Sequence, residues 1–214
     1  MSSAIPDALL FVAPGCPHCP AMLRGVNALM AEGLIDQLTV LNVVEHADQA
    51  TEYGVRTAPW LRLGAFILTG AHSLTELRRW AQWARGEEGS ARYVQYLLQQ
   101  ANYPQAVAFV AADTQRLKPL LTLLADVSTG IDIRVGMSAI LERYANTAEL
   151  QNLLPQLGAL TFHEDHRVRA DVCYLLGRTG AVAARPYLGT CLNDANLEVR
   201  EIAQEALEEL GLEA

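Results

Sequence analysis

Two kinds of hydrophobic pattern alternate along the first 86 residues of the chain. Residues 8–13 (ALLFVA) form a continuous apolar run ended by Pro14-Gly15, which is typical of a buried strand. From Pro17 to Glu32 apolar residues recur every three or four positions, and Gly33 follows, which predicts a helix and its end. Further along, the pattern predicts strands at 38–44, 60–63 and 65–68, a short helix at 46–53 and a helix from Ser73 to Gly86. The predicted order is β, α, β, short α, β, β, α.

A short polar stretch at residues 85–90 (RGEEGS) is the best candidate for a linker. After it, from Ala91 to the end, apolar residues recur with helical spacing between Gly, Pro and Asn or Asp breaks. We therefore predict two domains, an α/β domain over residues 1–86 and an all-helical domain over residues 87–214.

The helical part repeats itself. Three of its helices are predicted to begin at Asp132, Asp165 and Asn196, at intervals of 33 and 31 residues, because each of these side chains can cap a helix. The residues aligned after these caps are Val135-Gly136, Val168-Arg169 and Val199-Arg200. Because one helix pair cannot bury its apolar face alone, the units are expected to stack into a solenoid with an extended surface.

The DxxVR pattern and the paired helices over residues 113–212 resemble HEAT-like repeats, of the type found in phycobilisome-lyase-like proteins. Gly136 is a departure from this pattern, since it stands where the other two units have arginine. We expect Arg169 and Arg200 either to form ion pairs between adjacent units or to lie in solvent.

Composition narrows the class of protein and its partners. With 51% hydrophobic and 19% charged residues, both parts can build a core, so the chain is predicted to be globular. Residues 1–86 hold six Arg against seven Asp and Glu, so most of the net charge of −8 belongs to the second part. An acidic chain lacks the Lys and Arg surface that binds nucleic acid or an anionic membrane. We expect neither as a partner.

The compartment is predicted from targeting signals and cysteine use. The first residues, MSSAIPDALLFVAPG, lack the basic and apolar segments of a secretory signal, and no apolar run approaches the roughly 20 residues of a membrane span. Four cysteines, two of them in a CxxC, do not form the dense framework of a secreted disulfide scaffold. We therefore expect a cytoplasmic protein.

The sequence GCPHCP at residues 15–20 carries the clearest chemistry, since it lies between a predicted strand and a predicted helix. Placing Cys16 at the helix start directs unpaired backbone N–H groups and the positive dipole end at its sulfur, which favours a nucleophilic thiolate. Pro17 suits the first helical position, where its missing N–H would have been unpaired anyway. Cys19 lies one turn further on and can resolve a mixed disulfide formed at Cys16. An imidazole at His18 can stabilise the thiolate.

The order of elements, the CxxC and the Thr57-Ala58-Pro59 segment before the third strand together resemble the thioredoxin superfamily over residues 4–86. The resemblance implies a central four-stranded mixed sheet and thiol-disulfide oxidoreductase activity. It also implies that Pro59 follows a cis peptide bond and faces the CxxC, and that extended substrate binds the backbone of Ala58. The substrate-binding residues would then be Thr57, Ala58 and Pro59, with Trp60 beside them.

Two details bear on the redox chemistry. The Pro17-His18 dipeptide matches the disulfide oxidant DsbA, whereas the short length and the trailing Pro20 are similar to glutaredoxin-type domains. We expect a reduction potential between about −270 mV, the value for thioredoxin, and about −120 mV, the value for DsbA.

Many thioredoxins carry a buried acid six positions before the first cysteine, and this chain has Leu10 there. Proton transfer at Cys19 would then depend on water or another group.

Some residues of the first part have a second interpretation. Cys16 and Cys19 could be half of a zinc or iron-sulfur site, but no second CxxC or CxxH supplies the remaining ligands. Trp60 either lines the substrate groove or packs in its strand. His18 either tunes Cys16 or is merely exposed.

Two pairs of residues in the helical part have a second interpretation as well. Cys173 and Cys191 fall within the predicted repeats, which favours buried structural thiols over a second redox pair. His163 and His166 flank two acidic residues and either bind a metal or belong to a solvated turn between helices.

These features predict a thiol-disulfide oxidoreductase that acts on protein disulfides or thiols through Cys16 and Cys19. The helical repeats would be the surface that docks a protein substrate or redox partner. We expect no metal and no cofactor besides the redox-active disulfide. The alternatives are a non-catalytic interaction scaffold with a redox-responsive thioredoxin-like module, and repeats that handle a metal cluster or cofactor. The sequence leaves the direction of electron flow and the oligomeric state open.

Overall fold

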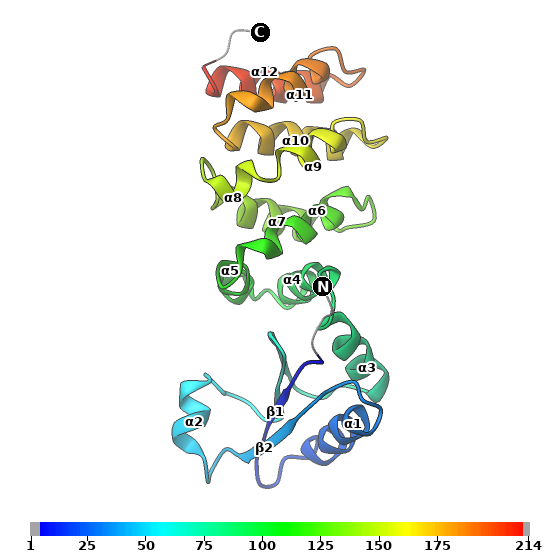
Figure 1. The fold of residues 1–214 in the computed structure, drawn as a ribbon, viewed down its shortest axis with the longest axis vertical. Helices are drawn as coiled ribbons and strands as arrows, with labels where there is room; N and C mark the ends of the chain where they lie inside the picture. The colour runs from blue at the N-terminus through cyan, green and yellow to red at the C-terminus, as the bar shows by residue number, and fades with distance from the viewer. Residues whose placement is uncertain (1–4, 212–214) are drawn as a thin grey trace. The chain divides into compact units, whose positions relative to one another are not determined.

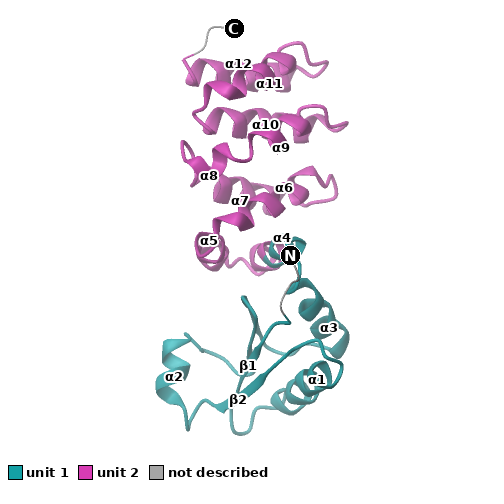
Figure 2. Cartoon of the chain, in the orientation of Figure 1, with its two compact units in different colours: residues 1–93 teal, residues 94–214 magenta. Residues whose placement is uncertain are grey.

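The computed structural model describes residues 5–211, which form two compact units (Figure 2). The first unit ends at Tyr93, within helix α4 (Glu88–Gln99). The sequence had placed a linker at 85–90, and α4 begins inside that stretch. Tyr93 explains why the first unit extends further than predicted, because its ring stacks on that of Phe66 with 4.7 Å between the centroids.

The first unit contains a four-stranded mixed sheet, as predicted. Its strands are β1 (Ala8–Val12), β2 (Leu38–Asn42), β3 (Trp60–Leu63) and β4 (Phe66–Thr69), in the spatial order β2-β1-β3-β4. β1 is parallel to β2 and antiparallel to β3, and β3 is antiparallel to β4. The turn between β3 and β4 contains Gly64 at a φ of 57°, which glycine adopts at little cost. The continuous apolar run of β1 suits its central place, since both faces of the strand are buried.

Helices cover both faces of this sheet (Figure 1). On one face α1 (Cys19–Ala31) packs against α3 (Leu74–Trp83), and the short α2 (Ala47–Glu52) lies on the other. α1 and α3 approach closely at Gly25, where a Cβ atom would lie 2.6 Å from the side chain of Leu77. The two helices are also joined by an ion pair of 2.6 Å between Arg78 and Glu32. The capping box predicted at Ser73 is present at the start of α3.

Trp60 belongs to the core on the α2 face of the sheet. Its ring packs edge to face on that of Phe11, with 5.7 Å between the centroids, in a cluster with Leu9 and Ala50. The residue is only 3% exposed. Trp60 therefore packs in its strand, and the interpretation that it lines a substrate groove is wrong.

The second unit is helical throughout residues 94–211. After α4 come α5 (Tyr103–Ala111), α6 (Leu117–Ala125), α7 (Ile131–Glu142), α8 (Ala148–Gln151), α9 (Leu154–Leu160), α10 (His166–Arg178), α11 (Arg185–Cys191) and α12 (Leu197–Glu209), with 3-10 turns at Thr114–Arg116 and Val182–Ala184. Figure 1 shows α6 with α7, α9 with α10 and α11 with α12 as successive layers. The prediction of an α/β part followed by an all-helical part is confirmed. Across the described residues, every helix is too short or too polar to cross a lipid bilayer.

The first repeat begins two residues earlier than predicted. α7 starts at Ile131 after Gly130, so Asp132 lies inside the helix and does not cap it. Asp165 and Asn196 do cap α10 and α12, because their side chains accept backbone N–H bonds. The repeat pattern of the sequence indicates Asp132 as the cap, because an aspartate is a stronger capping signal than a glycine.

This shift changes which residues are equivalent. The buried position after each cap is held by Ile133, Val168 and Val199. Val135, which the sequence placed there, is 61% exposed. The arginine of the first unit is therefore Arg134, and Gly136 does not replace it. Gly136 instead leaves room for the side chain of Leu98, which lies 2.8 Å from where a Cβ atom would be.

The three equivalent arginines bind the segment that precedes their own helix. Arg134, Arg169 and Arg200 each donate to backbone carbonyl oxygens there, at 2.6–3.2 Å. Arg169 also donates to both carboxylate oxygens of Asp194 in the next unit, at 2.6 and 2.8 Å, and Arg134 pairs with Asp171. An ion pair between adjacent units is thus confirmed for Arg169, whereas Arg200 binds backbone carbonyls.

Candidate active site

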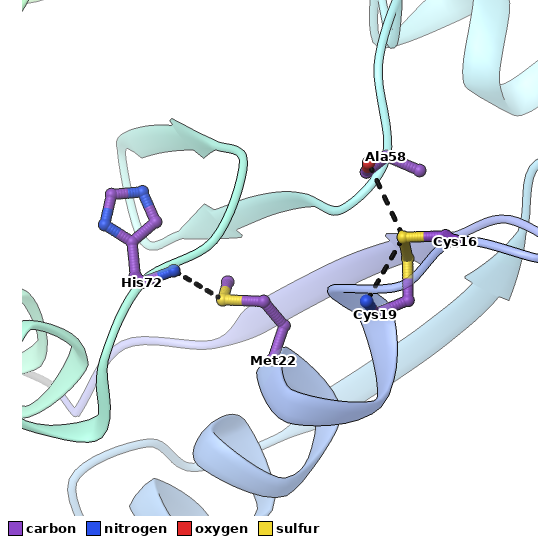
Figure 3. The surroundings of a disulfide bond; sticks show 5 residues. All are labelled: Cys16, Cys19, Met22, Ala58 and His72. Atoms are coloured by element: carbon purple, nitrogen blue, oxygen red, sulfur yellow. Dashed lines mark hydrogen bonds between the residues drawn. A yellow bond between two sulfur atoms is a disulfide. The ribbon is translucent and has the colours of Figure 1, made fainter.

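Cys16 and Cys19 form a disulfide at the start of α1, with 5.5 Å between their Cα atoms (Figure 3). Cys16 is half-buried, whereas Cys19 is only 5% exposed. A protein substrate can therefore reach the sulfur of Cys16 more readily than that of Cys19. This asymmetry suits a pair in which the first cysteine attacks and the second resolves.

The helix begins two residues later than the sequence predicted. The first helical residue is Cys19 and the preceding cap position is His18, so Cys16 and Pro17 lie before the helix, and the proline of the first turn is Pro20. The backbone N–H of Cys19 nevertheless donates to the sulfur of Cys16 at 3.1 Å. An unpaired N–H group at the start of α1 therefore does reach the sulfur of Cys16, as predicted, although Cys16 lies before the helix and not in it.

The loop before β3 faces this disulfide. The peptide bond between Ala58 and Pro59 is cis, as the resemblance implied. The carbonyl oxygen of Ala58 lies 3.6 Å from the sulfur of Cys16. A disulfide sulfur carries no hydrogen, so this approach is a van der Waals contact and not a hydrogen bond. The carbonyl of Pro59 accepts the N–H of Gly70 at 2.9 Å, which anchors the loop to the end of β4.

The remaining predicted site residues lie around this contact with different exposure. Thr57 is exposed, Ala58 is half-buried and Pro59 is buried. His18 is exposed, and within residues 5–211 its imidazole makes no capping bond to α1. Its predicted effect on Cys16 stays a prediction. Leu10 is fully buried in β1, so the position that carries an acid in many thioredoxins is apolar here.

Sequence reasoning missed a contact between α1 and the loop before α3. The backbone N–H of His72 donates to the sulfur of Met22 at 3.2 Å (Figure 3). Met22 is fully buried and lies one turn after Cys19. The imidazole of His72 is itself partly buried, and this burial is the main cause that lowers its pKa below the ordinary value. The sequence showed Met22 only as one apolar position of a helix, since nothing in its spacing indicates a partner 50 residues away.

The metal interpretations gain no support from the described residues. No group of three or more His, Cys, Asp and Glu side chains between residues 5 and 211 is arranged to hold a metal ion. The Nδ1 atom of His163 accepts the backbone N–H of Asp165 at 3.1 Å, and His166 is exposed at the first position of α10. His163 thus belongs to the turn between α9 and α10, and His166 lies in the exposed first turn of α10.

Comparison with known proteins adds an independent observation. A stretch of 52 residues is 42% identical to the thioredoxin of Methanocaldococcus jannaschii. It covers 23% of this chain and 60% of that thioredoxin. Over the matched stretch, the N-terminal part is similar to that thioredoxin. No protein-family model matches the chain.

The similarity to thioredoxin and the Cys16–Cys19 disulfide point to the same kind of module. The chain spans 60% of the length of the thioredoxin it matches, and its first unit carries the mixed sheet together with a bonded Cys16–Cys19 pair. These observations support a thioredoxin-like redox module in the N-terminal part.

Proposed function

We propose that this protein is a thiol-disulfide oxidoreductase that acts on protein disulfides or thiols through Cys16 and Cys19. The observation that carries the proposal is the half-buried sulfur of Cys16, which lies between the first N–H of α1 and the carbonyl of Ala58. A substrate sulfur can approach from the open side, while Cys19 stays protected beneath.

The reaction with a substrate disulfide has two exchange steps. The thiolate of Cys16 attacks one substrate sulfur, forms a mixed disulfide and releases the other substrate sulfur as a thiolate, which takes up a proton. Cys19 then loses its proton, attacks the sulfur of Cys16, restores the Cys16–Cys19 disulfide and releases the second substrate thiol. Two cysteines are oxidised and one substrate disulfide is reduced. The same steps in reverse oxidise a dithiol.

The roles of the neighbouring residues follow from their places. The N–H of Cys19 stabilises the negative charge on the Cys16 sulfur in the reduced form. Pro17 and His18 precede the helix on its exposed side, where an imidazole can add to that stabilisation. The backbone of Thr57, Ala58 and Pro59 positions an extended substrate, and the small side chain of Ala58 leaves its approach open. The chemistry requires no cofactor or metal besides the disulfide.

We propose that the second unit docks the protein substrate or redox partner and is a HEAT-like repeat of the phycobilisome-lyase type. Stacked helix pairs with equivalent arginines support this assignment. Large apolar side chains, such as Phe162 at 74% and Ile131 at 71% exposure, offer contact surface. The acidic composition supports a protein partner over nucleic acid or a membrane, and we propose that this partner is met in the cytoplasm.

The activity is tested by reduction of insulin disulfides with dithiothreitol as the electron donor. We expect the wild type to accelerate the reaction and Cys16→Ser to lose at least about a hundredfold of that acceleration, because the nucleophile is gone. Cys191→Ser is the matched control, a cysteine outside the CxxC, and should keep the activity. A wild type that does not accelerate the reduction of insulin or the refolding of a reduced disulfide protein contradicts the proposal.

A further inference from the structure

A connecting segment of three residues, 70–72, joins β4 to α3 and touches both sides of the candidate active site. The N–H of Gly70 donates to the carbonyl oxygen of Pro59 at 2.9 Å. Two residues later, the N–H of His72 donates to the sulfur of Met22 at 3.2 Å (Figure 3). The first bond holds the loop before β3, and the second holds the first turn of α1. The connecting segment therefore links the CxxC to the proline loop.

These two bonds complete a closed circuit of contacts around the disulfide. Met22 belongs to the first turn of α1, since its N–H donates to the carbonyl oxygen of His18 at 3.1 Å. In the same turn the N–H of Cys19 donates to the sulfur of Cys16, and that sulfur lies 3.6 Å from the carbonyl oxygen of Ala58. The sulfur of Met22 is thus the point at which the start of α1 is tied to the segment that also holds the proline loop.

The two ends of the connecting segment are held independently of Met22. Gly70 follows β4 directly and has a φ of 83°, which glycine adopts at little cost. At the other end Ser73 caps α3 through its capping box. Further along α1, the contact of Gly25 with Leu77 fixes the two helices against each other. Loss of the bond to Met22 would therefore move the first turn of α1 relative to the proline loop and leave the packing of the helices in place.

The side chain of Met22 combines packing with an acceptor. It is fully buried, and an apolar side chain of similar volume would fill the same space. The thioether differs from such a side chain because its sulfur accepts a hydrogen bond. The N–H of His72 uses that sulfur, so the residue type at position 22 decides whether this donor has an acceptor.

We propose that Met22 is a positioning residue of the oxidoreductase, whose sulfur keeps the proline loop at the distance from Cys16 that a protein substrate requires. The inference rests on the function proposed above. An extended substrate contacts the backbone of Ala58 while its disulfide reacts at Cys16, so the spacing of these two groups determines how well it binds. A small disulfide needs only the sulfur of Cys16. Loss of the acceptor therefore weakens binding of protein disulfides and spares the reaction with small ones.

The test compares Met22→Leu with Met137→Leu in the full chain. Leucine has nearly the volume of methionine and no acceptor. Met137 is fully buried in α7, so the control makes the same change of side chain away from the site. We expect Met22→Leu to raise KM for insulin about fivefold, with kcat and the rate with hydroxyethyl disulfide within about twofold of the wild type. Met137→Leu should keep all three values.

A second pair of proteins separates the sulfur atom from the shape of the side chain. With Met30→Leu and Met137→Leu, Met22 is the methionine that remains besides Met1, and it is replaced biosynthetically by selenomethionine or norleucine. Selenium keeps an acceptor, whereas norleucine has a methylene group at that place. We expect the KM for insulin to stay at the wild-type value with selenomethionine and to rise with norleucine. The amide hydrogen of His72 should exchange at least about tenfold faster with norleucine, measured by NMR.

Three results would overturn the role of Met22. They are equal KM values for the selenomethionine and norleucine proteins, an unchanged exchange rate of the His72 amide, and an equal loss of rate with insulin and the small disulfide in Met22→Leu. The last would show that Met22 only packs beneath the CxxC. Failure of the proposed function is distinct, because the wild type itself would then accelerate neither reaction, and both proposals would fall.

Discussion

The sulfur of Cys16 lies 3.6 Å from the carbonyl oxygen of Ala58, which is 42 residues further along the chain. This contact joins the turn before α1 to the loop before β3. It places the more exposed sulfur of the disulfide beside a stretch of backbone that a substrate chain can follow.

Replacing the resolving cysteine should trap the substrate. In Cys19→Ser, Cys16 can still attack a disulfide but the mixed disulfide has no internal thiol to release it. We expect a stable adduct at Cys16 after incubation with a disulfide-linked peptide, measured by intact mass. Cys16→Ser is the control and should form no adduct. Equal adduct formation by both variants would show that the roles assigned to the two cysteines are wrong.

His18 is expected to make the disulfide more oxidising. An imidazole that stabilises the Cys16 thiolate stabilises the reduced form, so His18→Gly should lower the reduction potential by about 30 mV or more, which is a tenfold change in the exchange equilibrium constant. The potential is measured by equilibration with glutathione. Substitution of His46, an exposed histidine outside the motif, should leave it unchanged. A potential that His18→Gly does not alter removes His18 from the mechanism.

Ala58 should control access of large substrates but not of small ones. In Ala58→Leu the added side chain narrows the approach to Cys16, and we expect kcat/KM for a protein disulfide to fall about tenfold, or about 1.4 kcal/mol in transition-state free energy. Alkylation of reduced Cys16 by iodoacetamide should change less than twofold. Ala65→Leu, at an exposed alanine in the β3–β4 turn, is the matched control. If Ala58→Leu lowers both kcat/KM and the alkylation rate of Cys16, the substitution has disturbed the loop, and selective control of access by Ala58 is contradicted.

The ion pair between Arg169 and Asp194 should stabilise the helical unit. Both side chains are largely buried, at 15% and 9% exposure, so Arg169→Ala leaves a carboxylate without its partner and should cost about 2–4 kcal/mol in the free energy of unfolding. Urea unfolding followed by far-UV circular dichroism measures it. Arg167→Ala removes a 57% exposed arginine from the same helix and should cost much less.

The same pair predicts a pH dependence. Arg169 is the main cause that lowers the pKa of Asp194 below its value in the unfolded chain. The stabilisation is therefore complete above about pH 4, the unfolded-state pKa of an aspartate, and is lost as pH falls through the lower folded-state value. Asp194→Asn should flatten this acid limb of the stability curve. An unchanged acid limb would show that other carboxylates determine it.

Tyr93 should stabilise the edge of the sheet. Its hydroxyl accepts the N–H of Ile67 at 2.8 Å and donates to the carbonyl of the same residue at 3.0 Å, so it occupies the free side of β4. We expect Tyr93→Phe to lower the free energy of unfolding of the first unit by about 1–2 kcal/mol, because two hydrogen bonds are lost and the ring packing is kept. Tyr53→Phe, at a 36% exposed tyrosine, is the control and should stay within about 0.5 kcal/mol of the wild type.

Local patterns of the sequence were enough for most of the fold. The apolar run in β1, the spacing of Met22, Val26 and Leu29 in α1 and the capping box at Ser73 each describe a few adjacent residues, and each predicted its element correctly. Where two local signals compete, the sequence was less reliable. Asp132 is a better cap than Gly130 by residue type, but the burial of Ile133 decides where α7 begins.

By itself, the sequence determined the order of the elements and the pair of cysteines that can bond, because helix and strand periods and a CxxC spacing depend on near neighbours alone. The tertiary structure decided that Cys16 meets Ala58, that Met22 accepts from His72 and that Tyr93 covers β4. Each of these contacts joins residues from different elements. Their distance is fixed by how side chains fill the space between packed helices and strands, which no pattern along one segment records.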